Sequence, residues 1–210
     1  MRLNKNDITQ RIEKISKQVE EISELKTQLS PMRVELLNRI RFAECLDGNF
    51  LKRFFLSYAI WGFYTHKDSI QNFNLFEFPK NYGGNEEDLN CVIGHEIMHN
   101  AQHSNFPDFI LDLNHYGSWI TDCKYFKSYL RLFEGDAEFI SKSLKSEYYP
   151  NSKYAPSKMI KLFLPKTDEE VENVYEEGYK IIKREFGNDR KKINSLYNLR
   201  NKEILEIFGD

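Results

Sequence analysis

The stretch that decides the fold is GHEIMH at residues 94–99, which contains the pattern HExxH. It lies in a predicted helix that begins after Asn85, a good N-cap residue followed by acidic residues, and runs to about His103. Residues at i and i+4 lie one turn apart on the same face of a helix, so the imidazoles of His95 and His99 can converge on one Zn²⁺. The sequence therefore predicts a zinc ion, one per chain, on this helix.

Glu96 directly follows the first histidine, and its carboxylate can reach a zinc-bound water molecule rather than the metal. A carboxylate in that place suits a general base for attack on a carbonyl, with zinc lowering the pKa of the water toward ~7. The plainer interpretation is a pair of histidines at helical spacing on a half-buried helix. Apolar residues around the motif argue against it, because they supply a separate face for burial. They are Cys91, Val92, Ile93, Ile97 and Met98.

A catalytic zinc site also needs a third protein ligand and an open position. His103 continues the same helical face, but eight residues along a helix span ~12 Å, too far from the first histidine to share one metal. His115 is not excluded by geometry, although no motif surrounds it. The longer pattern HExxHxxGxxH is absent, because Gln102 and Asn105 stand where it needs glycine and histidine. Glu134 is the third candidate.

Glu134 lies in the segment LFEGDAE, residues 132–138, where the sequence resembles the gluzincins, peptidases built from HExxH and a downstream glutamate ligand. In that clan the ligand often sits in an E-G-x-A segment or is followed four residues later by an acid, and both features occur here. The resemblance implies that Glu134 binds zinc with His95 and His99. It also implies that Glu138 hydrogen-bonds the outer nitrogen of a ligand histidine, although an ordinary surface glutamate is the other interpretation.

The segment VYEEG at residues 174–178 resembles the part of the gluzincin aminopeptidases that carries an oxyanion-stabilising tyrosine. The match points to Tyr175, with Tyr179 one turn further on as the alternative, and either ring also suits simple packing. No histidine follows His115 that could polarise a carbonyl instead. The G-x-M-E-N segment that holds a free amine in aminopeptidases is absent, which favours an endo- or oligopeptidase.

With 210 residues, the chain most resembles the minigluzincins, short members of the same clan. That resemblance implies an α+β, mainly helical, compact zincin-like domain with a small sheet above the HExxH helix. Residues 73–78 are expected as an edge strand to which a peptide substrate pairs. The resemblance also suggests a latent form, in which a terminal segment covers the cleft.

Two other functions stay open from the sequence. A degenerate zincin could act as a zinc-stabilised binding or regulatory module, although an intact Glu96 has no use in a pure scaffold. Alternatively the HExxH pattern is accidental, and the chain is an interaction protein that works through its N-terminal helix. Metal content separates this last function from the others, and proteolysis separates the first two.

Residues 1–48 are predicted as an N-terminal helical extension, a pro-segment or a brace, that precedes a catalytic domain at residues 49–210. Over residues 7–29 apolar side chains recur every three or four positions, which is typical of an amphipathic helix. Its stripe could pack on the rest of the chain, which is the safer default, or on a second copy. Pro31 suits the first turn of a second helix that runs to about Leu46.

The remaining chain is predicted as helices around a small β element. An aromatic stretch at residues 50–66 favours a buried helix after a turn at residues 47–49, and residues 67–84 permit one or two short strands. The other expected elements are a helix around residues 130–146, a loop at residues 149–165 and a helical region at residues 168–208 that breaks at Gly187.

Composition limits the partners and the location. The net charge is −2 and no basic patch indicates nucleic acid. The three cysteines form no CxxC pair, which favours reduced thiols over disulfides or a thiolate metal site. The N-terminus lacks a signal-peptide core, and the most apolar stretch, residues 54–64, is about half the ~20 residues of a membrane helix. We therefore expect a soluble cytoplasmic protein with a peptide or protein substrate and no membrane partner.

Overall fold

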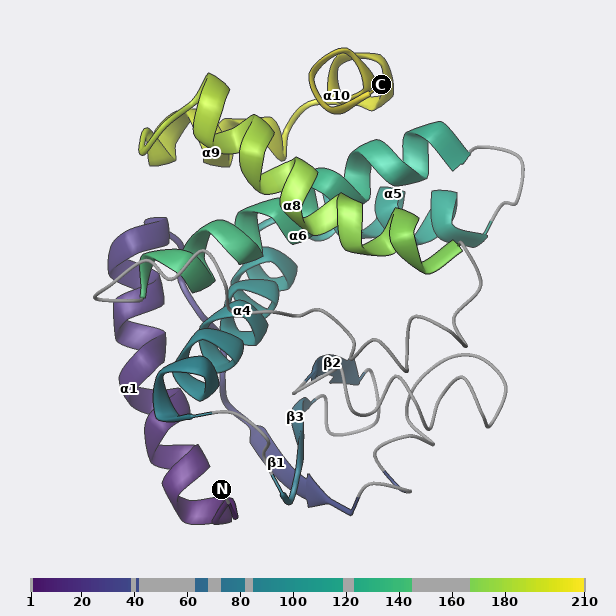
Figure 1. The fold of residues 1–210 in the computed structure, drawn as a ribbon. Helices are drawn as coiled ribbons and strands as arrows, with labels where there is room; N and C mark the ends of the chain where they lie inside the picture. Colours follow the sequence, from purple (N-terminus) through teal and green to yellow (C-terminus); the bar gives the residue numbers. More distant parts are fainter. Residues whose placement is uncertain are drawn as a thin grey trace.

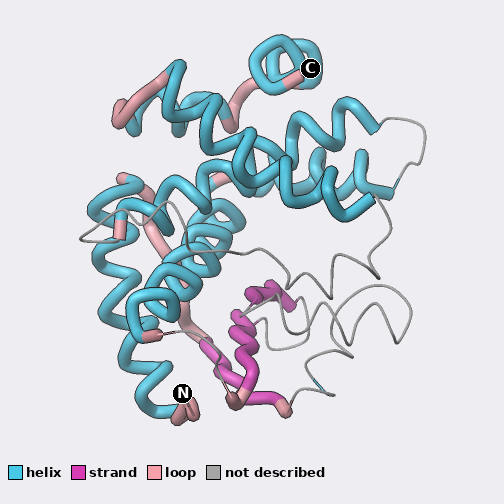
Figure 2. The backbone as a smooth tube through the Cα atoms, viewed as in Figure 1, coloured by secondary structure: helices cyan, strands magenta, loops and turns pink. Residues whose placement is uncertain are grey.

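The structure is a computed structural model, and it describes residues 2–38, 41, 63–67, 73–81, 85–118, 123–144 and 167–209. The described part is mainly helical (Figure 1) with one small sheet (Figure 2), which confirms the α+β, mainly helical class. Its helices are α1 (Lys5–Ser23), α4 (Glu86–Asn105), α5 (Pro107–Ser118), α6 (Cys123–Ser143), α8 (Thr167–Glu185), α9 (Arg190–Leu196) and α10 (Asn201–Phe208). Its strands are β1 (Met32–Leu37), β2 (Phe63–Lys67) and β3 (Phe73–Pro79). Within the described ranges, every helix is too short or too polar to cross a bilayer.

The three strands form one sheet in the order β1-β3-β2. β1 runs parallel to β3, with Met32 opposite Asn74, and β2 runs antiparallel to it, with Lys67 opposite Phe73. β3 therefore lies in the middle of the sheet, and the prediction of an edge strand at residues 73–78 is wrong. Among the described strands, β1 and β2 form the edges.

β1 also corrects the predicted second helix, because residues 32–37 are a strand. The sequence MRVEL alternates apolar and charged side chains, which is the two-residue period of a strand. The N–H of Asn74 donates to the carbonyl of Pro31 at 2.9 Å, so the proline leads into the ladder with β3 and not into a helix. The predicted helix at residues 50–66 is likewise wrong at its end, since β2 begins at Phe63.

Several predicted elements lie outside the described residues. They are the turn at residues 47–49, the predicted helix at residues 50–62 and the loop at residues 149–165.

α1 is the predicted amphipathic helix, but it ends earlier than residue 29. Glu24 has a left-handed backbone with φ of 57°, and its N–H donates to the carbonyl of Glu20, which closes the helix there. The stripe of α1 packs on α4 and β1, as the default interpretation expects. Its most buried members are Ile8, Ile12, Ile15 and Val19, each at most 3% exposed. The division of the chain at residue 48 stays a prediction, although β1 and β3 pair across it.

α4 begins where the sequence predicts. The Asn85 side chain accepts from the N–H of Asp88 at 2.9 Å, and the Asp88 carboxylate accepts from the N–H of Asn85 at 3.3 Å, which forms a capping box. The helix then runs between α1, α6 and β2 (Figure 1). Ile93 and Ile97 are 0% exposed, so the core holds the backbone that carries the HExxH residues.

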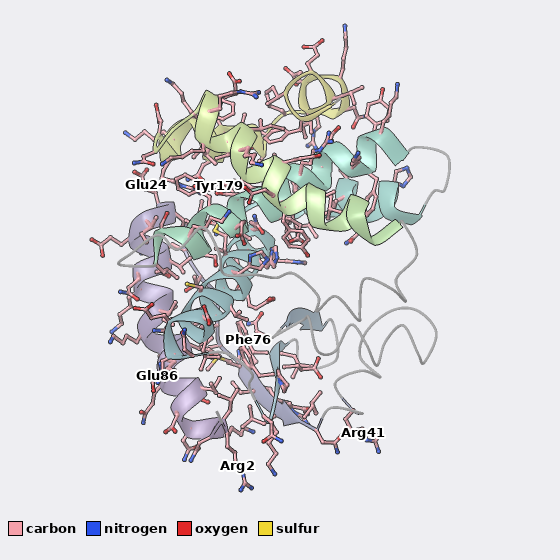
Figure 3. All side chains as sticks on the ribbon, viewed as in Figure 1. Arg2, Glu24, Arg41, Phe76, Glu86 and Tyr179 are labelled. Atoms are coloured by element: carbon pink, nitrogen blue, oxygen red, sulfur yellow. The ribbon has the colours of Figure 1, made fainter. Side chains whose placement is uncertain are left out.

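Side chains sort clearly between the core and the surface (Figure 3). Phe76 of the central strand is 0% exposed and lies inside the molecule, whereas Arg2 and Glu86 are exposed and point outward. The guanidinium of Arg131, on α6, donates to Glu177 of α8 and to the carbonyl of Phe208 in α10, each at 2.6 Å. Buried polar contacts therefore join the helices of the C-terminal half.

Two glycines let α6 and α8 approach until their backbones touch. A Cβ atom on Gly135 would overlap the backbone of Gly178, and a Cβ atom on Gly178 would overlap the carbonyl oxygen of Arg131. Gly135 follows Glu134, and Gly178 lies one turn after Tyr175. The contact between the glycines therefore sets the distance between these two candidate site residues.

The C-terminal helical region breaks as predicted. Gly187 has a φ of +59°, a conformation that glycine adopts without strain, and it separates α8 from α9. The helix predicted around residues 130–146 is α6, which begins earlier, at Cys123. The sequence did not predict α5.

Candidate metal centre

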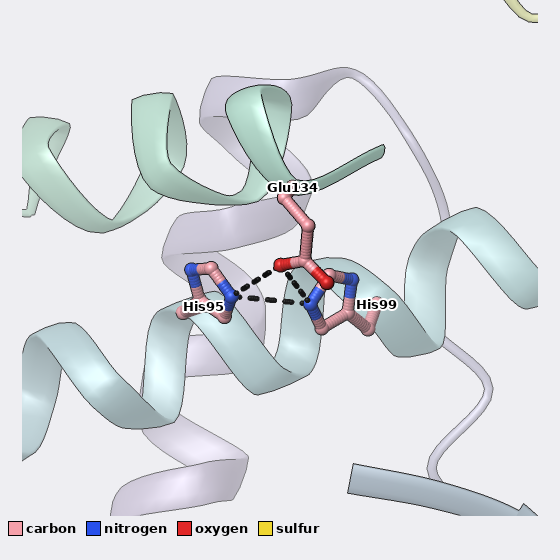
Figure 4. A group of neighbouring side chains, drawn as sticks. All are labelled: His95, His99 and Glu134. Carbon is pink, nitrogen blue, oxygen red and sulfur yellow. Dashed lines mark hydrogen bonds and ion pairs between the residues drawn. The ribbon is translucent and has the colours of Figure 1, made fainter. Parts of the chain in front are cut away.

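α4 and α6 bring together three side chains that can hold one metal ion (Figure 4). The Nε2 atoms of His95 and His99 are 3.1 Å apart, and Oε2 of Glu134 lies 3.2 Å from each of them. The side chains are 13%, 10% and 12% exposed, respectively. Within the described residues, no other group of three His, Cys, Asp or Glu side chains places its ligand atoms this close together.

The spacing of these atoms fits a zinc ion. Bonds of ~2.0–2.2 Å in a tetrahedron place neighbouring ligand atoms about 3.3 Å apart, close to the 3.1 and 3.2 Å found here. Two imidazole nitrogens with one carboxylate oxygen suit zinc better than Mg²⁺ or Ca²⁺, which prefer oxygen ligands. Three protein ligands also leave the fourth position of a tetrahedron for water or a substrate.

The charges of the three residues support one another. Burial opposes protonation of His95, but the hydrogen bond and the charge of Glu134 outweigh it and raise the pKa of His95 to about 9. Burial also works against ionisation of Glu134, yet the charge of His99 and the hydrogen bonds of both histidines lower its pKa to about 2. Glu134 is therefore a carboxylate at neutral pH, which is the form that binds a metal.

Glu96 and Tyr175 lie at the same cluster. Glu96 is 8% exposed on α4, and its charge acts on both His95 and Tyr175. The Tyr175 ring, from α8, stacks on the His95 ring with centroids 5.8 Å apart and an angle of 25°. The charge of Glu134, together with burial, raises the pKa of Tyr175 well above its usual value. The phenol therefore keeps its proton at neutral pH and can donate a hydrogen bond.

Tyr179, the alternative to Tyr175, has other neighbours. Its ring lies under the ammonium of Lys142, 3.8 Å from the ring centre, and 6.2 Å from the ring centroid of Phe139. Tyr179 belongs to α8 and is labelled in Figure 3. These contacts are those of a packing residue, so the structure places Tyr175, and not Tyr179, against a predicted ligand.

Glu138 lies near the outer nitrogen of a predicted ligand, but not at the hydrogen-bonding distance that the resemblance implies. Its Oε2 atom is 3.8 Å from Nδ1 of His95, which is ion-pair distance and longer than a hydrogen bond. Lys142 holds the other carboxylate oxygen of Glu138 at 3.3 Å and also binds Glu176 at 2.8 Å. The carboxylate near the outer nitrogen of His95 is therefore held by a lysine.

The outer nitrogen of His99 has a partner that the sequence analysis missed. Nδ1 of His99 lies 2.7 Å from Oε1 of Gln102, one turn further along α4, and Gln102 is 0% exposed. The Phe133 ring stacks on the His99 ring with centroids 4.2 Å apart. The spacing of three residues between His99 and Gln102 is a local signal that could have indicated this contact.

The other candidates for the third ligand lie elsewhere. The ring of His103 meets the edge of Phe133 with centroids 6.3 Å apart. His115 is exposed near the end of α5. Neither belongs to the three-residue group, in which Glu134 takes the third position.

Comparisons of the chain with protein-family models, with curated proteins and with solved structures find no match.

Proposed function

We propose that this protein is a zinc-dependent peptidase of the gluzincin type, an endo- or oligopeptidase with a compact zincin-like domain. One observation carries the proposal. Two helices place two imidazoles and one carboxylate within zinc-binding distance. The phenol of Tyr175 stacks on one imidazole, and the buried carboxylate of Glu96 lies close enough for its charge to act on both rings. A metal ligand set, a base and a hydrogen-bond donor in one cluster are the parts that hydrolysis of a peptide bond requires.

A zinc ion held by His95, His99 and Glu134 would lower the pKa of a coordinated water molecule toward ~7 and polarise a carbonyl. Glu96 then acts as the general base, because it is the carboxylate next to the ligands in the sequence and has no place in the ligand group itself. It removes a proton from the attacking water and can pass that proton to the leaving amine.

Tyr175 has a separate role in this proposal. Its protonated phenol, stacked on His95, donates a hydrogen bond to the oxygen that becomes negative as water attacks. Tyr175 and Glu96 come from different helices, so the substrate carbonyl would lie between α4 and α8.

The sheet supports an extended peptide as the substrate class. β2 is an edge strand among the described strands, and it packs against α4, the helix that carries the ligands. An extended peptide can pair with such an edge through backbone hydrogen bonds. The strand expected to bind substrate therefore changes from β3 to β2.

The expected latent form stays a prediction, but α1 is not placed over the ligands. The Arg11 side chain donates to Asn90 at 3.0 Å, and Ile15 approaches Gly94, so α1 covers that face of α4. With 3.6 residues per turn, that face lies roughly 100–180° around the helix from the two histidines. α1 braces the back of the helix.

The test of the function compares Glu96→Gln with the parent chain. We expect one zinc per chain in both proteins, and hydrolysis of a quenched fluorescent peptide library lower by ~10²–10⁴ in the variant, because the base is lost and the ligands are not. Glu87→Gln, an exposed acid on the same helix, is the matched control and should behave like the parent.

The alternative function predicts a different result. A zinc-stabilised binding module would bind one zinc but hydrolyse no peptide in the parent chain. Equal hydrolysis by the parent and by Glu96→Gln would contradict the role of Glu96. A parent chain without zinc would contradict the ligand set.

A further inference from the structure

A continuous chain of buried hydrogen bonds leads away from the metal centre. It begins at Nδ1 of His99, which lies 2.7 Å from Oε1 of Gln102. Nε2 of Gln102 donates to the hydroxyl of Tyr197 at 2.7 Å, and that hydroxyl donates to Asp136 at 2.9 Å. Arg190 donates to both oxygens of Asp136, at 2.6 and 3.2 Å. We call these four residues after His99 the relay.

The relay is buried and joins three parts of the fold. Its exposed fractions are 0% for Gln102 and Asp136, 3% for Tyr197 and 6% for Arg190. α4 supplies Gln102, α6 supplies Asp136, and the two ends of α9 supply Arg190 and Tyr197. A buried polar group that loses its hydrogen-bond partner destabilises the folded state. Each hydrogen bond in this set therefore restricts the orientation of the groups that it joins.

A hydrogen bond to the Phe133 carbonyl fixes the orientation of the Gln102 amide. Nε2 of Gln102 also donates to this carbonyl at 2.8 Å, and a carbonyl can only accept. The amide nitrogen must therefore face Phe133 and Tyr197, and the amide oxygen must face His99. An oxygen there can only accept, so Nδ1 of His99 has to carry the proton.

This arrangement determines which nitrogen of His99 is available. When Nδ1 of the neutral ring is protonated, Nε2 has a free lone pair. Nε2 is the atom that lies 3.2 Å from Glu134 and 3.1 Å from Nε2 of His95. Along the path from His99 through Gln102 and Tyr197, each hydrogen bond is donated toward the carboxylate of Asp136, so these bonds strengthen one another.

We propose that Gln102 is a positioning residue that holds His99 in the metal-binding tautomer. Tyr197, Asp136 and Arg190 act through Gln102, because they hold its amide in the required orientation. The relay rests on the proposed function insofar as His99 binds zinc. The proton on Nδ1 of His99 depends on Gln102 in the chain without metal as well, so it can be measured separately.

The first measurement is the ¹⁵N spectrum of the His99 ring in the metal-free chain. We expect the signature of a protonated Nδ1 in the parent and a mixture of tautomers in Gln102→Met, which keeps the volume of the side chain and removes its polar atoms. The second measurement is the dissociation constant for Zn²⁺ by competition with a chelator. Loss of an outer partner of a ligand histidine raises it by ~10–100-fold.

Tyr197→Phe tests the relay without touching His99. It removes one acceptor of Gln102 and should raise the zinc dissociation constant by a smaller factor, on the order of a few-fold. Tyr129→Phe is the matched control. Tyr129 is 0% exposed, and its hydroxyl lies 3.0 Å from Asn201 and 3.4 Å from Asp112, neither of which belongs to the relay. Both variants should lose similar stability, but only Tyr197→Phe should weaken zinc binding.

The outcomes distinguish a failure of the relay from a failure of the proposed function. The relay is overturned if a folded Gln102→Met keeps the parent tautomer and zinc affinity, or if Tyr197→Phe and Tyr129→Phe bind zinc alike. If Gln102→Met does not fold, the two tyrosine variants decide. If the parent binds no zinc, the proposed function fails, and the His99 tautomer in the parent and the variants still supports or overturns the relay.

Discussion

α4 is held on its two sides by different kinds of contact. Against α1 the contact is mainly apolar, through Ile12 and Ile15, and the hydrophobic effect that drives it has no preferred direction. Against α6 it is polar and directional, through Glu134 and the Gln102 amide, with hydrogen-bonding atoms 2.8–3.2 Å apart. The contact with α1 stabilises the fold, and the contact with α6 fixes the positions of the ligand atoms in the proposed zinc site.

The difference matters for substitutions. An apolar interface tolerates a change of shape when volume is kept, and it loses stability roughly in proportion to the atoms removed. A directional cluster loses its function when one partner changes, even if the fold survives. The two sides of α4 should therefore separate stability from zinc binding and catalysis. The predictions below run from the largest expected change in the free energy of unfolding to the smallest.

Deletion of residues 1–30 should give the largest effect. It removes four buried apolar side chains of α1, each worth roughly 1.5–3 kcal/mol on burial, against a total stability of ~5–15 kcal/mol. We expect the truncated chain to lose its cooperative thermal transition. A truncated chain that folds, binds zinc and cleaves peptides faster than the parent would instead make α1 a cover of the site.

Ile12→Ala tests the same side of α4 in a milder way. Ile12 is 0% exposed, so its truncation should lower the free energy of unfolding by ~2–5 kcal/mol. Zinc affinity of the remaining folded protein should not change, because the ligands are on another face. Denaturant titration and chelator competition on one preparation check both statements.

Glu134→Ala should remove zinc and the stability that zinc provides. A ligand present at 100–1,000 times its dissociation constant stabilises the folded state by ~2.7–4.1 kcal/mol. The parent should therefore melt at a higher temperature with zinc than with a chelator, and the variant should melt at one temperature in both. Full retention of zinc by the variant, measured by elemental analysis, would show that another residue is the third ligand.

Gly178→Ala should push α6 and α8 apart. The new methyl group overlaps the carbonyl oxygen of Arg131, and such overpacking lowers stability by ~1–3 kcal/mol. The shift also moves Tyr175 away from His95, so kcat should fall as well. Gly187→Ala is the control, because it strains a left-handed backbone far from this contact. It should lower stability and leave kcat unchanged.

The sequence predicted best the features that neighbouring residues determine. The start of α4 depends on Asn85 and Asp88, three residues apart, and the ligand pair depends on one helical turn. β1 was missed because Pro31 fits a helix start as well as a strand start, and pairing with β3, some 40 residues away, decides between them. The apolar stripe of α1 followed from its period, and its packing on the same chain was the default interpretation.

The candidate site was likewise predicted only where neighbouring residues carry the pattern. The group of His95, His99 and Glu134 was predicted because two short segments carry it, and the second came from a resemblance. The relay was not predicted, because Gln102 and Tyr197 are 95 residues apart and an amide beside a phenol has no local pattern. Contacts between distant segments need the fold before they can be seen.

Tyr175→Phe should change stability least and test the directional side of α4 most sharply. The substitution keeps the ring that stacks on His95 and removes only the hydroxyl, so the melting temperature should barely move. A phenol that donates to the developing oxyanion stabilises the transition state far more than the bound substrate. Its loss should therefore lower kcat by ~10²–10³ and change KM little.

Tyr179→Phe is the matched control for that prediction. Tyr179 lies one turn further along the same helix, and its ring contacts Lys142 and Phe139 instead of a ligand. Since Lys142 lies over the face of the ring, loss of the hydroxyl should leave that contact in place, and neither kcat nor zinc affinity should change. Steady-state kinetics of both variants, on protein with equal zinc content, decide the assignment. If Tyr179→Phe is the slow variant, or if Tyr175→Phe keeps the parent kcat, the stacking of Tyr175 on His95 is packing and the oxyanion has another donor.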